Sequence, residues 1–185
     1  MKVVLIGMKH CGKSTLGTAL ANRWGCPFHD IDRLIEEHQA CDSGKWLSVR
    51  DIFNTLGEAR FTELEAQAVS ELYLSLHESP AAAVVAVGGR TALNERVADL
   101  LGGIGTVVYL EVSPEEMFRR VLAGGLPSFI NQEDPVMSFL ELYQERVPHY
   151  RRRAELTVNL DGLSVEAGLE KLCRELERAD QTRRA

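Results

Sequence analysis

The sequence has no apolar run that approaches the roughly 20 residues a membrane-spanning helix needs. It also has no excess of positive charge, because 21 Lys and Arg stand against 27 Asp and Glu and give a formal net charge of -6. A nucleic-acid partner normally requires a broad basic face. We therefore expect neither a membrane nor a nucleic acid to be a partner of this chain.

Cysteine is sparse and follows no metal-binding or disulfide pattern. The four cysteines form no C-x-x-C pair, so neither a zinc site nor a disulfide framework is indicated. A reducing compartment suits such a chain, and we expect it to be cytoplasmic. We also expect a monomer. Internal repeats and low-complexity linkers are absent as well, so residues 1–185 are predicted to form a single domain.

Apolar runs alternate with amphipathic stretches, which is typical of a parallel sheet covered by helices on both faces. We predict strands near residues 2–7, 27–30, 82–87, 105–112 and 155–159. Helices are predicted near residues 13–24, 48–56, 58–78, 92–101, 114–123, 135–147 and 164–178. The fold class is therefore α/β.

The helix near residues 114–123 has the clearest predicted start. Ser113 can cap it, Pro114 occupies the first helical position, and Glu116 completes a capping box. Two other segments, 38–47 and 124–134, interrupt the regular alternation and contain glycines. Such loops are candidate lids in phosphoryl-transfer enzymes, and the alternative is an ordinary surface loop.

A short apolar strand runs directly into a phosphate-binding motif near the N-terminus. Gly7, Gly12, Lys13 and Ser14 satisfy G-x-x-x-x-G-K-[ST], in which glycines let backbone N–H groups turn inward around phosphates. Lys13 then reaches the phosphates, and the Ser14 hydroxyl is placed to ligate Mg²⁺. The helix that follows directs its free N–H groups at the anion, so the motif predicts nucleotide binding.

Two acids spaced by one residue, Asp30 and Asp32, follow a short strand. At a strand end, one carboxylate can turn toward the metal and phosphate site while the other approaches an acceptor hydroxyl. The alternative is a helix N-cap followed by a solvated acid. With the phosphate loop present, we favour the functional interpretation.

An apolar strand at residues 84–87 ends in Gly88, Gly89 and Arg90. Ligands bind at the carboxyl ends of strands in parallel α/β sheets, and glycine lets backbone N–H groups approach them closely. A plain tight turn is the alternative. Arg146, on a helix predicted to end at Pro148, could hold a carboxylate through two hydrogen bonds, although such a residue on its own is more often a solvated helix face.

Together these motifs resemble the shikimate kinase family of P-loop kinases over nearly the whole chain. The resemblance rests on the phosphate loop at 7–15, F-x-D-x-D-x-x-I-E at 28–36, I-F-x-x-x-G-E at 52–58 with Phe61 and Glu65 following, the glycine pair at 88–89, and R-x-P-x-Y at 146–150. It implies a five-stranded parallel sheet in a three-layer P-loop kinase architecture, with an acceptor-binding segment at about 31–62 and a lid at about 124–134.

The resemblance also implies roles for residues of this chain. ATP is expected to contact Gly7, His10, Cys11, Gly12, Lys13, Ser14, Thr15 and Arg120, and Mg²⁺ is expected at Ser14 and Asp30. The acceptor is expected to contact Asp32, Gly88, Gly89, Arg90 and Arg146, with Arg146 on its carboxylate. Lys13 and Asp32 are the predicted catalytic residues, with Asp32 as the base that receives the hydroxyl proton.

Three positions depart from the family pattern. This chain has Thr62 where the family has a substrate-binding arginine, Arg90 where it has a third glycine, and Leu126 where it has the arginine of the lid. If Arg90 replaces the missing acceptor contact and Arg119 or Arg120 partly compensates in the lid, the chain is a shikimate kinase. Otherwise it acts on another small anionic hydroxyl compound, or it is a nucleotide-binding sensor without turnover.

Overall fold

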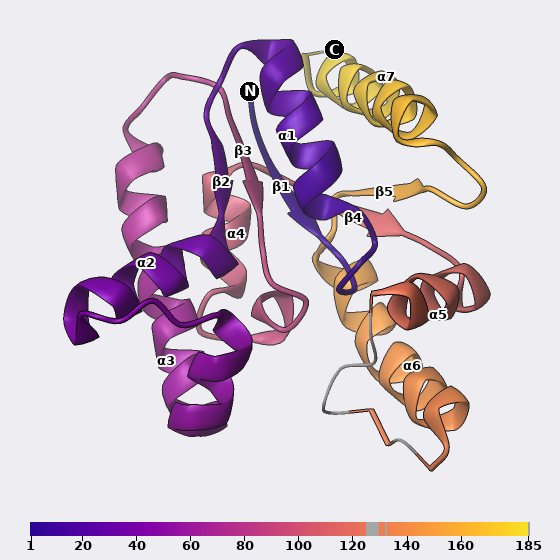
Figure 1. Ribbon diagram of the computed structural model, residues 1–185. Helices are drawn as coiled ribbons and strands as arrows, with labels where there is room; N and C mark the ends of the chain where they lie inside the picture. The colour runs from indigo at the N-terminus through magenta and orange to yellow at the C-terminus, as the bar shows by residue number, and fades with distance from the viewer. Residues whose placement is uncertain (125–129, 132, 185) are drawn as a thin grey trace.

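The computed structural model describes residues 1–124, 130, 131 and 133–184. Within that part of the chain, five strands form one parallel sheet in the order β2-β3-β1-β4-β5 (Figure 1). The strands are β1 (Lys2–Ile6), β2 (Phe28–Asp30), β3 (Ala83–Ala86), β4 (Thr106–Glu111) and β5 (Leu156–Asn159). The predicted α/β class and the five-stranded parallel sheet are confirmed.

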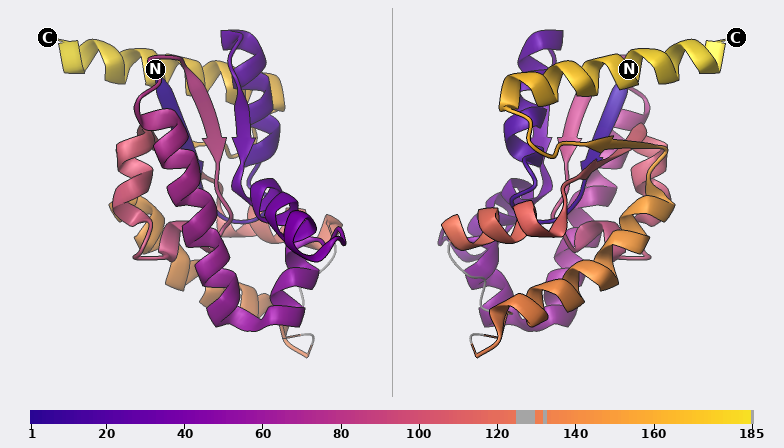
Figure 2. Two further views of the ribbon diagram at one scale, coloured as in Figure 1. Left: turned by 90° about the vertical axis from the view of Figure 1, so that its left-hand side faces the viewer. Right: turned by 90° about the vertical axis from the view of Figure 1, so that its right-hand side faces the viewer.

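Helices cover both faces of the sheet, which gives the three layers. Helices α1 (Lys13–Trp24) and α7 (Val165–Arg184) lie on one face, and α3 (Val49–His77) and α4 (Ala98–Ile104) lie on the other (Figure 2). Strands buried on both faces need continuous apolar runs, and Val3, Val4 and Leu5 in β1 are all fully buried.

The carboxyl ends of the strands point toward the side of the molecule where the remaining elements gather. Helix α2 (Ile31–Ser43) follows β2, the 3₁₀ turn η1 (Thr91–Leu93) follows β3, and α5 (Pro114–Ala123) follows β4. Helix α6 (Pro135–Arg153) packs beside η1 and α5. In Figure 1, α2 and α3 stand on one side of this edge and α5 and α6 on the other.

Helix α2 corrects the expectation of a loop at residues 38–47, because the helix continues to Ser43 and ends at Gly44, whose φ of 70° is left-handed. The Asp30 side chain caps it by accepting a hydrogen bond from the Asp32 N–H at 3.1 Å. This helix was difficult to predict from the sequence, because its buried residues are only Ile31 and Ile35. An apolar stripe that short gives a weak helical period.

The helix expected at residues 92–101 is wrong. The chain instead forms η1, a short connection, and α4 from Ala98. Asn94 explains the interruption, because its Oδ1 accepts from the Arg96 N–H at 3.1 Å and its Nδ2 donates to the Thr62 carbonyl at 3.2 Å. Side-chain hydrogen bonds of this kind offer the backbone an alternative to the helix.

Helix α6 passes through Pro148 and continues to Arg153, so the expected stop at the proline is also wrong. Proline removes one backbone donor from a helix interior and crowds the preceding turn. Tyr150 offsets that cost, because its side chain is fully buried and its hydroxyl donates to the Gly89 carbonyl at 2.5 Å. Tertiary packing therefore retains the last turn of α6.

The two helices predicted at 48–56 and 58–78 appear as one element, α3, with a break at Gly57. Gly57 has φ 77° and ψ 171°, which are not helical values. In the described part of the chain, no helix is long and apolar enough to cross a membrane. The predicted lid at 124–134 falls mostly on residues 125–129 and 132, including Leu126, which lie outside the described residues.

Candidate active site

The loop between β1 and α1 has the backbone of a phosphate cradle. Gly7, His10 and Gly12 have φ values of 145°, 70° and 106°, and Gly12 caps α1 directly. At Gly7 a Cβ would lie 2.9 Å from both the Cys11 Sγ and the Leu110 carbonyl oxygen, so only glycine fits there. The loop leads into a helix N-terminus, which is a favourable environment for an anion.

Lys13 is buried at the start of α1, and its ammonium group turns back into the loop. Its Nζ donates to the carbonyls of Gly7 at 2.9 Å and Met8 at 2.8 Å. A phosphate entering the loop would meet this cation together with the backbone N–H groups. Cys11 is also buried, so its thiol is not exposed to solvent.

Ser14 and Asp30 meet beside the phosphate loop, although sixteen positions separate them in the chain. The Ser14 Oγ donates to the Asp30 Oδ2 at 2.7 Å. Asp30 therefore does two things at once, since its other oxygen caps α2. The cap proposed as an alternative at this position is present, and it coexists with a hydroxyl and carboxylate pair suited to a hard cation.

The Asp32 carboxylate reaches the end of β3. At Gly88 a Cβ would lie 2.6 Å from Asp32 Oδ1, so glycine makes room for this acid. Burial, followed by the nearby charge of Asp30, raises the pKa of Asp32, while Lys13 and Lys9 oppose the increase. An ionised carboxylate in such surroundings is a stronger base than one in water.

One cavity of about 510 Å³ joins Asp32 to the other predicted acceptor residues, Gly88, Gly89, Arg90 and Arg146. It also includes Lys9 and His10 of the phosphate loop. Arg146 is buried, and its Nη1 would lie 3.7 Å from a Cβ at Gly89. The structure therefore brings the predicted acceptor residues together next to the predicted phosphate position.

The charges around this cavity favour an anionic ligand. Its described lining has four basic residues, Lys9, Arg50, Arg90 and Arg146, and two acids, Asp32 and Glu65. Phe53 and Phe61 form an apolar wall, with ring centroids 5.5 Å apart in an edge-to-face arrangement. Such a cavity suits a small molecule with an apolar face and a carboxylate.

Glu65 is a site residue to which the sequence analysis gave no role. It is buried, and its Oε1 accepts a hydrogen bond from the Thr91 Oγ1 at 2.7 Å. Burial raises the pKa of Glu65 to about 7, while the Thr91 hydrogen bond and the charges of Arg90 and Arg146 act to lower it. A signal was available, because Glu65 occupies a core-facing position of α3 between Phe61 and Val69.

Arg50 and Phe53 were missed as well, and both come from the first part of α3. A charged residue near a helix N-terminus is normally interpreted as exposed to solvent. No local sequence pattern therefore indicates that Arg50 belongs to the site. Thr62, where the family pattern has an arginine, lines a neighbouring groove of about 500 Å³. That groove shares Glu65, Arg90 and Arg146 with the first cavity.

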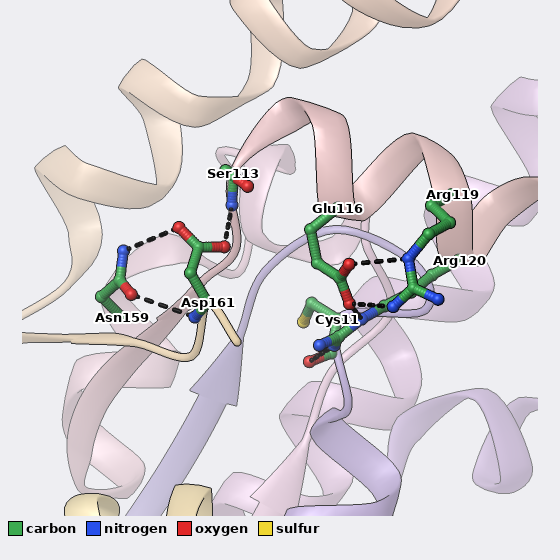
Figure 3. Close-up of polar contacts among 7 residues, drawn as sticks. All are labelled: Cys11, Ser113, Glu116, Arg119, Arg120, Asn159 and Asp161. Carbon is green, nitrogen blue, oxygen red and sulfur yellow. Dashed lines mark hydrogen bonds and ion pairs between the residues drawn. The ribbon is translucent and has the colours of Figure 1, made fainter. Parts of the chain in front are cut away.

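Arg120 reaches the phosphate loop from α5. Its Nη1 donates to the Cys11 carbonyl at 3.3 Å, and its Nε donates to Glu116 at 2.8 Å (Figure 3). Glu116 also holds Arg119, which is largely exposed. Arg120 therefore lies at the loop, as an ATP contact requires.

This use of Glu116 contradicts the predicted capping box. Among the described residues the Ser113 side chain caps no helix N–H, while its backbone N–H donates to Asp161 Oδ1 at 2.7 Å (Figure 3). Pro114 does occupy the first helical turn as expected. Two arginines offer a carboxylate stronger hydrogen bonds than one backbone N–H does, which explains the exchange.

Comparison with known proteins agrees with this geometry. A sequence model described as shikimate kinase matches residues 9–177. A shikimate kinase of Paracidovorax citrulli is 34% identical, with 97% of this chain and 93% of that protein covered. A shikimate kinase of Rhodococcus jostii is also 34% identical, with 95% and 97% covered.

Solved structures give the same result. Shikimate kinase from Acinetobacter baumannii in complex with shikimate aligns with a TM-score of 0.82 at 25% identity, over 96% of this chain and 93% of that one. Shikimate kinase from Bacteroides thetaiotaomicron aligns with a TM-score of 0.79 at 28% identity, over 96% and 98%. The similarity therefore extends over nearly the whole of this chain.

Proposed function

This chain belongs to the shikimate kinase family, and from that premise we propose that it transfers the γ-phosphoryl group of ATP to a hydroxyl of shikimate. The family uses ATP as its phosphoryl donor. One observation carries the proposal: a cation-rich cavity containing Asp32 opens directly beside the phosphate loop. The donor and the acceptor hydroxyl can therefore meet between that loop and that carboxylate.

The donor side consists of the backbone of the phosphate loop, Lys13 and the N-terminus of α1. Phosphoryl transfer needs positioning and charge neutralisation more than covalent chemistry. Lys13 can exchange its hydrogen bonds to the Gly7 and Met8 carbonyls for phosphate oxygens. The ATP contacts we propose are Gly7, His10, Cys11, Gly12, Lys13, Ser14, Thr15 and Arg120.

Ser14 and Asp30 fit a magnesium ion. Their oxygens lie 2.7 Å apart beside the loop, and Mg²⁺ usually takes one or two protein oxygens and completes its shell with phosphates and water. We propose that these two residues hold it, Ser14 directly and Asp30 directly or through water. When bound, the ion neutralises charge on the transferring phosphates.

Asp32 is the proposed base and orienting residue for the acceptor hydroxyl. Its partly desolvated carboxylate faces the cavity and touches the end of β3. It accepts a hydrogen bond from the hydroxyl, fixes the direction of the oxygen lone pair, and receives the proton as the new P–O bond forms. Gly88 and Gly89 let the acceptor approach the backbone, and Arg146 binds its carboxylate.

All groups named here come from one chain, so the proposal requires no second copy, nucleic acid or membrane. We accordingly propose a monomer that acts on small molecules. The four cysteines are free thiols, which supports a reducing, cytoplasmic location.

The proposal is tested by measuring ADP release from Mg·ATP with and without shikimate. The wild-type protein should release ADP only when shikimate is present, and Lys13→Met should lose this activity by several powers of ten while retaining its circular dichroism spectrum. Equal ADP release without shikimate would contradict the acceptor assignment. ATP binding without any release would indicate a nucleotide-binding sensor instead.

A second candidate substrate class is another small anionic hydroxyl compound. The observation that favours it is the groove of about 500 Å³ beside Thr62, which adjoins the acceptor cavity at Arg90 and Arg146. A screen of hydroxy acids larger than shikimate in the same ADP assay separates the two candidates. A higher kcat/KM for one of those acids would select it over shikimate.

A further inference from the structure

Arg90 separates the two adjoining cavities of the site. It lines the acceptor cavity beside Asp32 and also lines the groove beside Thr62. It follows the glycine pair after β3 directly, as the N-cap residue of η1. Arg90 therefore enters both cavities from the sheet edge rather than from α3.

Two contacts hold the Arg90 side chain across this boundary. Its Nη2 donates to Glu58 Oε1 on α3, and its guanidinium carbon lies 5.6 Å from the centre of the Phe53 ring. Phe53 is itself part of the apolar wall of the acceptor cavity. A long, flexible side chain is thus fixed by one ion pair and one cation–π contact from the same helix.

The other side of the boundary is formed by Arg146 of α6. Both arginines are close enough to lower the pKa of the buried Glu65 through their charges. Both also line both cavities. Two guanidinium groups from different elements therefore approach Glu65, a buried acid that lines both cavities.

Resting on the function proposed above, we propose that Arg90 is a second anchor for the carboxylate of the acceptor, acting together with Arg146, and that Glu58 is the residue that positions Arg90. One arginine can already hold both oxygens of a carboxylate, and a second guanidinium group adds a further charge-assisted hydrogen bond, which is stronger than the neutral one that Thr62 could donate. Glu58 acts only through Arg90, because it orients the guanidinium before the acceptor arrives and lowers the entropy lost on binding. The pair thereby selects acceptors that carry a carboxylate.

The anchor is tested by comparing shikimate with methyl shikimate, in which the carboxylate is an uncharged ester. Arg90→Ala should raise the KM for shikimate about tenfold to a hundredfold, as expected for a lost hydrogen bond to a charged group, and should change the KM for the ester far less. The KM for ATP should stay unchanged. Arg60→Ala is the matched control, since Arg60 is an exposed, ion-paired arginine on α3 that lines neither cavity.

The positioning role of Glu58 is tested with a double-mutant cycle. Glu58→Gln should raise the KM for shikimate about two- to fivefold, the range expected for an exposed ion pair. The same substitution in the Arg90→Ala background should have no effect. Glu63→Gln, which breaks the exposed pair with Arg60, is the control that should change nothing. A lower KM for Glu58→Gln, or an equal effect in both backgrounds, would overturn the positioning role.

A rescue variant shows whether Arg90→Ala acts by removing the carboxylate anchor or by damaging the site in general. Thr62→Arg combined with Arg90→Ala places a guanidinium group in the same groove from α3, and it should recover most of the preference for shikimate over the ester. Equal losses for acid and ester in Arg90→Ala would overturn the anchor.

Binding measurements distinguish this proposal from the function on which it rests. Isothermal titration calorimetry measures the affinities for shikimate and for its methyl ester, and their difference reports on the carboxylate anchor without requiring turnover. If the wild-type protein transfers no phosphoryl group but binds the acid more tightly than the ester, and Arg90→Ala removes that preference, the proposed function fails and the anchor stands. If wild type binds both equally, the anchor fails.

Discussion

At the scale of single residues, the acceptor cavity is organised around buried charge. Glu65 is almost completely buried and accepts a hydrogen bond from Thr91, while Arg90, Arg146 and Asp32 all influence its pKa. Burying a carboxylate is costly unless it is paired or protonated. The ionisation of Glu65 therefore makes the stability of the protein depend on pH.

Glu65→Gln should change the pH dependence of unfolding. The pKa of Glu65 is raised from 4.5 to about 7, so between these values the folded state holds a proton that the unfolded state has lost. Stability from this proton is fully present below about pH 4.5 and is lost as the pH rises through about 7. The free energy of unfolding of wild type, relative to Glu65→Gln, should therefore fall by roughly 3 kcal/mol between pH 4.5 and pH 8.

Urea denaturation of both proteins at pH 5, 6, 7 and 8 measures this difference. Gln keeps an oxygen that can accept from Thr91, so the variant removes the titration and retains the hydrogen bond. Parallel curves for wild type and Glu65→Gln would show that Glu65 does not titrate in this range.

Asp32→Asn should separate chemistry from nucleotide binding. The carboxylate faces the acceptor cavity, so removing its charge should lower kcat by about 10²- to 10⁴-fold, as is usual for a lost general base. The Kd for ATP should change by less than about threefold, because Asp32 is not among the proposed ATP contacts on the phosphate loop, α1 and α5. Equal losses in both quantities would assign Asp32 a structural role.

Local sequence motifs predicted some site residues and not others. Short sequence motifs contain Lys13, Ser14 and Asp32 together with the neighbours that indicate their chemistry. These three residues could therefore be predicted from the sequence. Glu65 and Arg50 enter the site through the direction in which α3 packs. That direction depends on long-range contacts, which no short pattern contains.

At the scale of elements, the break in α3 sets the positions of the side chains that contact Arg90. Gly57 has a φ of 77° and divides the helix between Phe53 and Glu58, the two residues that hold Arg90. If the two segments formed one straight helix, the side chains of Phe53 and Glu58 would point in different directions. The predicted boundary between the helices at 48–56 and 58–78 therefore coincides with the break that positions Phe53 and Glu58.

Gly57→Ala should destabilise the protein by about 1–2 kcal/mol, because an L-residue is strained at this backbone conformation. No atom lies within 4 Å of a Cβ at Gly57, so crowding does not contribute. Gly102→Ala is the matched control, since Gly102 lies inside α4 with equally open space. That change should stabilise by about 0.5–1 kcal/mol.

Chemical denaturation of the two variants tests this contrast, and the KM for shikimate gives a second readout. Gly57→Ala should raise that KM by displacing Phe53 and Glu58 relative to Arg90, whereas Gly102→Ala should leave it unchanged. A stabilised Gly57→Ala variant with an unaltered KM would show that the break does not orient the site.

Two of the elements that sequence reasoning misjudged share one cause. Asn94 interrupts the predicted helix at 92–101 through side-chain hydrogen bonds, and Tyr150 retains the turn of α6 after Pro148. In each case a contact with a distant segment outweighs local propensity. Strands β1, β3 and β4 were predicted well because burial on both faces leaves an unbroken apolar run in the sequence.

At the scale of the whole molecule, the parallel sheet sets the two halves of the reaction side by side. The ends of β1 and β3 are adjacent because these strands pair directly, so the phosphate loop and the glycine pair share one edge. Helix α3 then supplies Phe53, Phe61 and Glu65 to the lining of the cavity beside Asp32, and α6 supplies Arg146. The chain order alone would separate these segments by about eighty residues, and only the topology unites them.

The central claim is that the γ-phosphoryl group of ATP reaches a hydroxyl of shikimate in this cavity. The most direct measurement is ³¹P NMR of the purified protein with Mg·ATP and shikimate. The account predicts that ADP and a single new phosphate monoester resonance appear in equal amounts, and that both are absent with Lys13→Met. Formation of ADP together with inorganic phosphate, and no monoester, would contradict it.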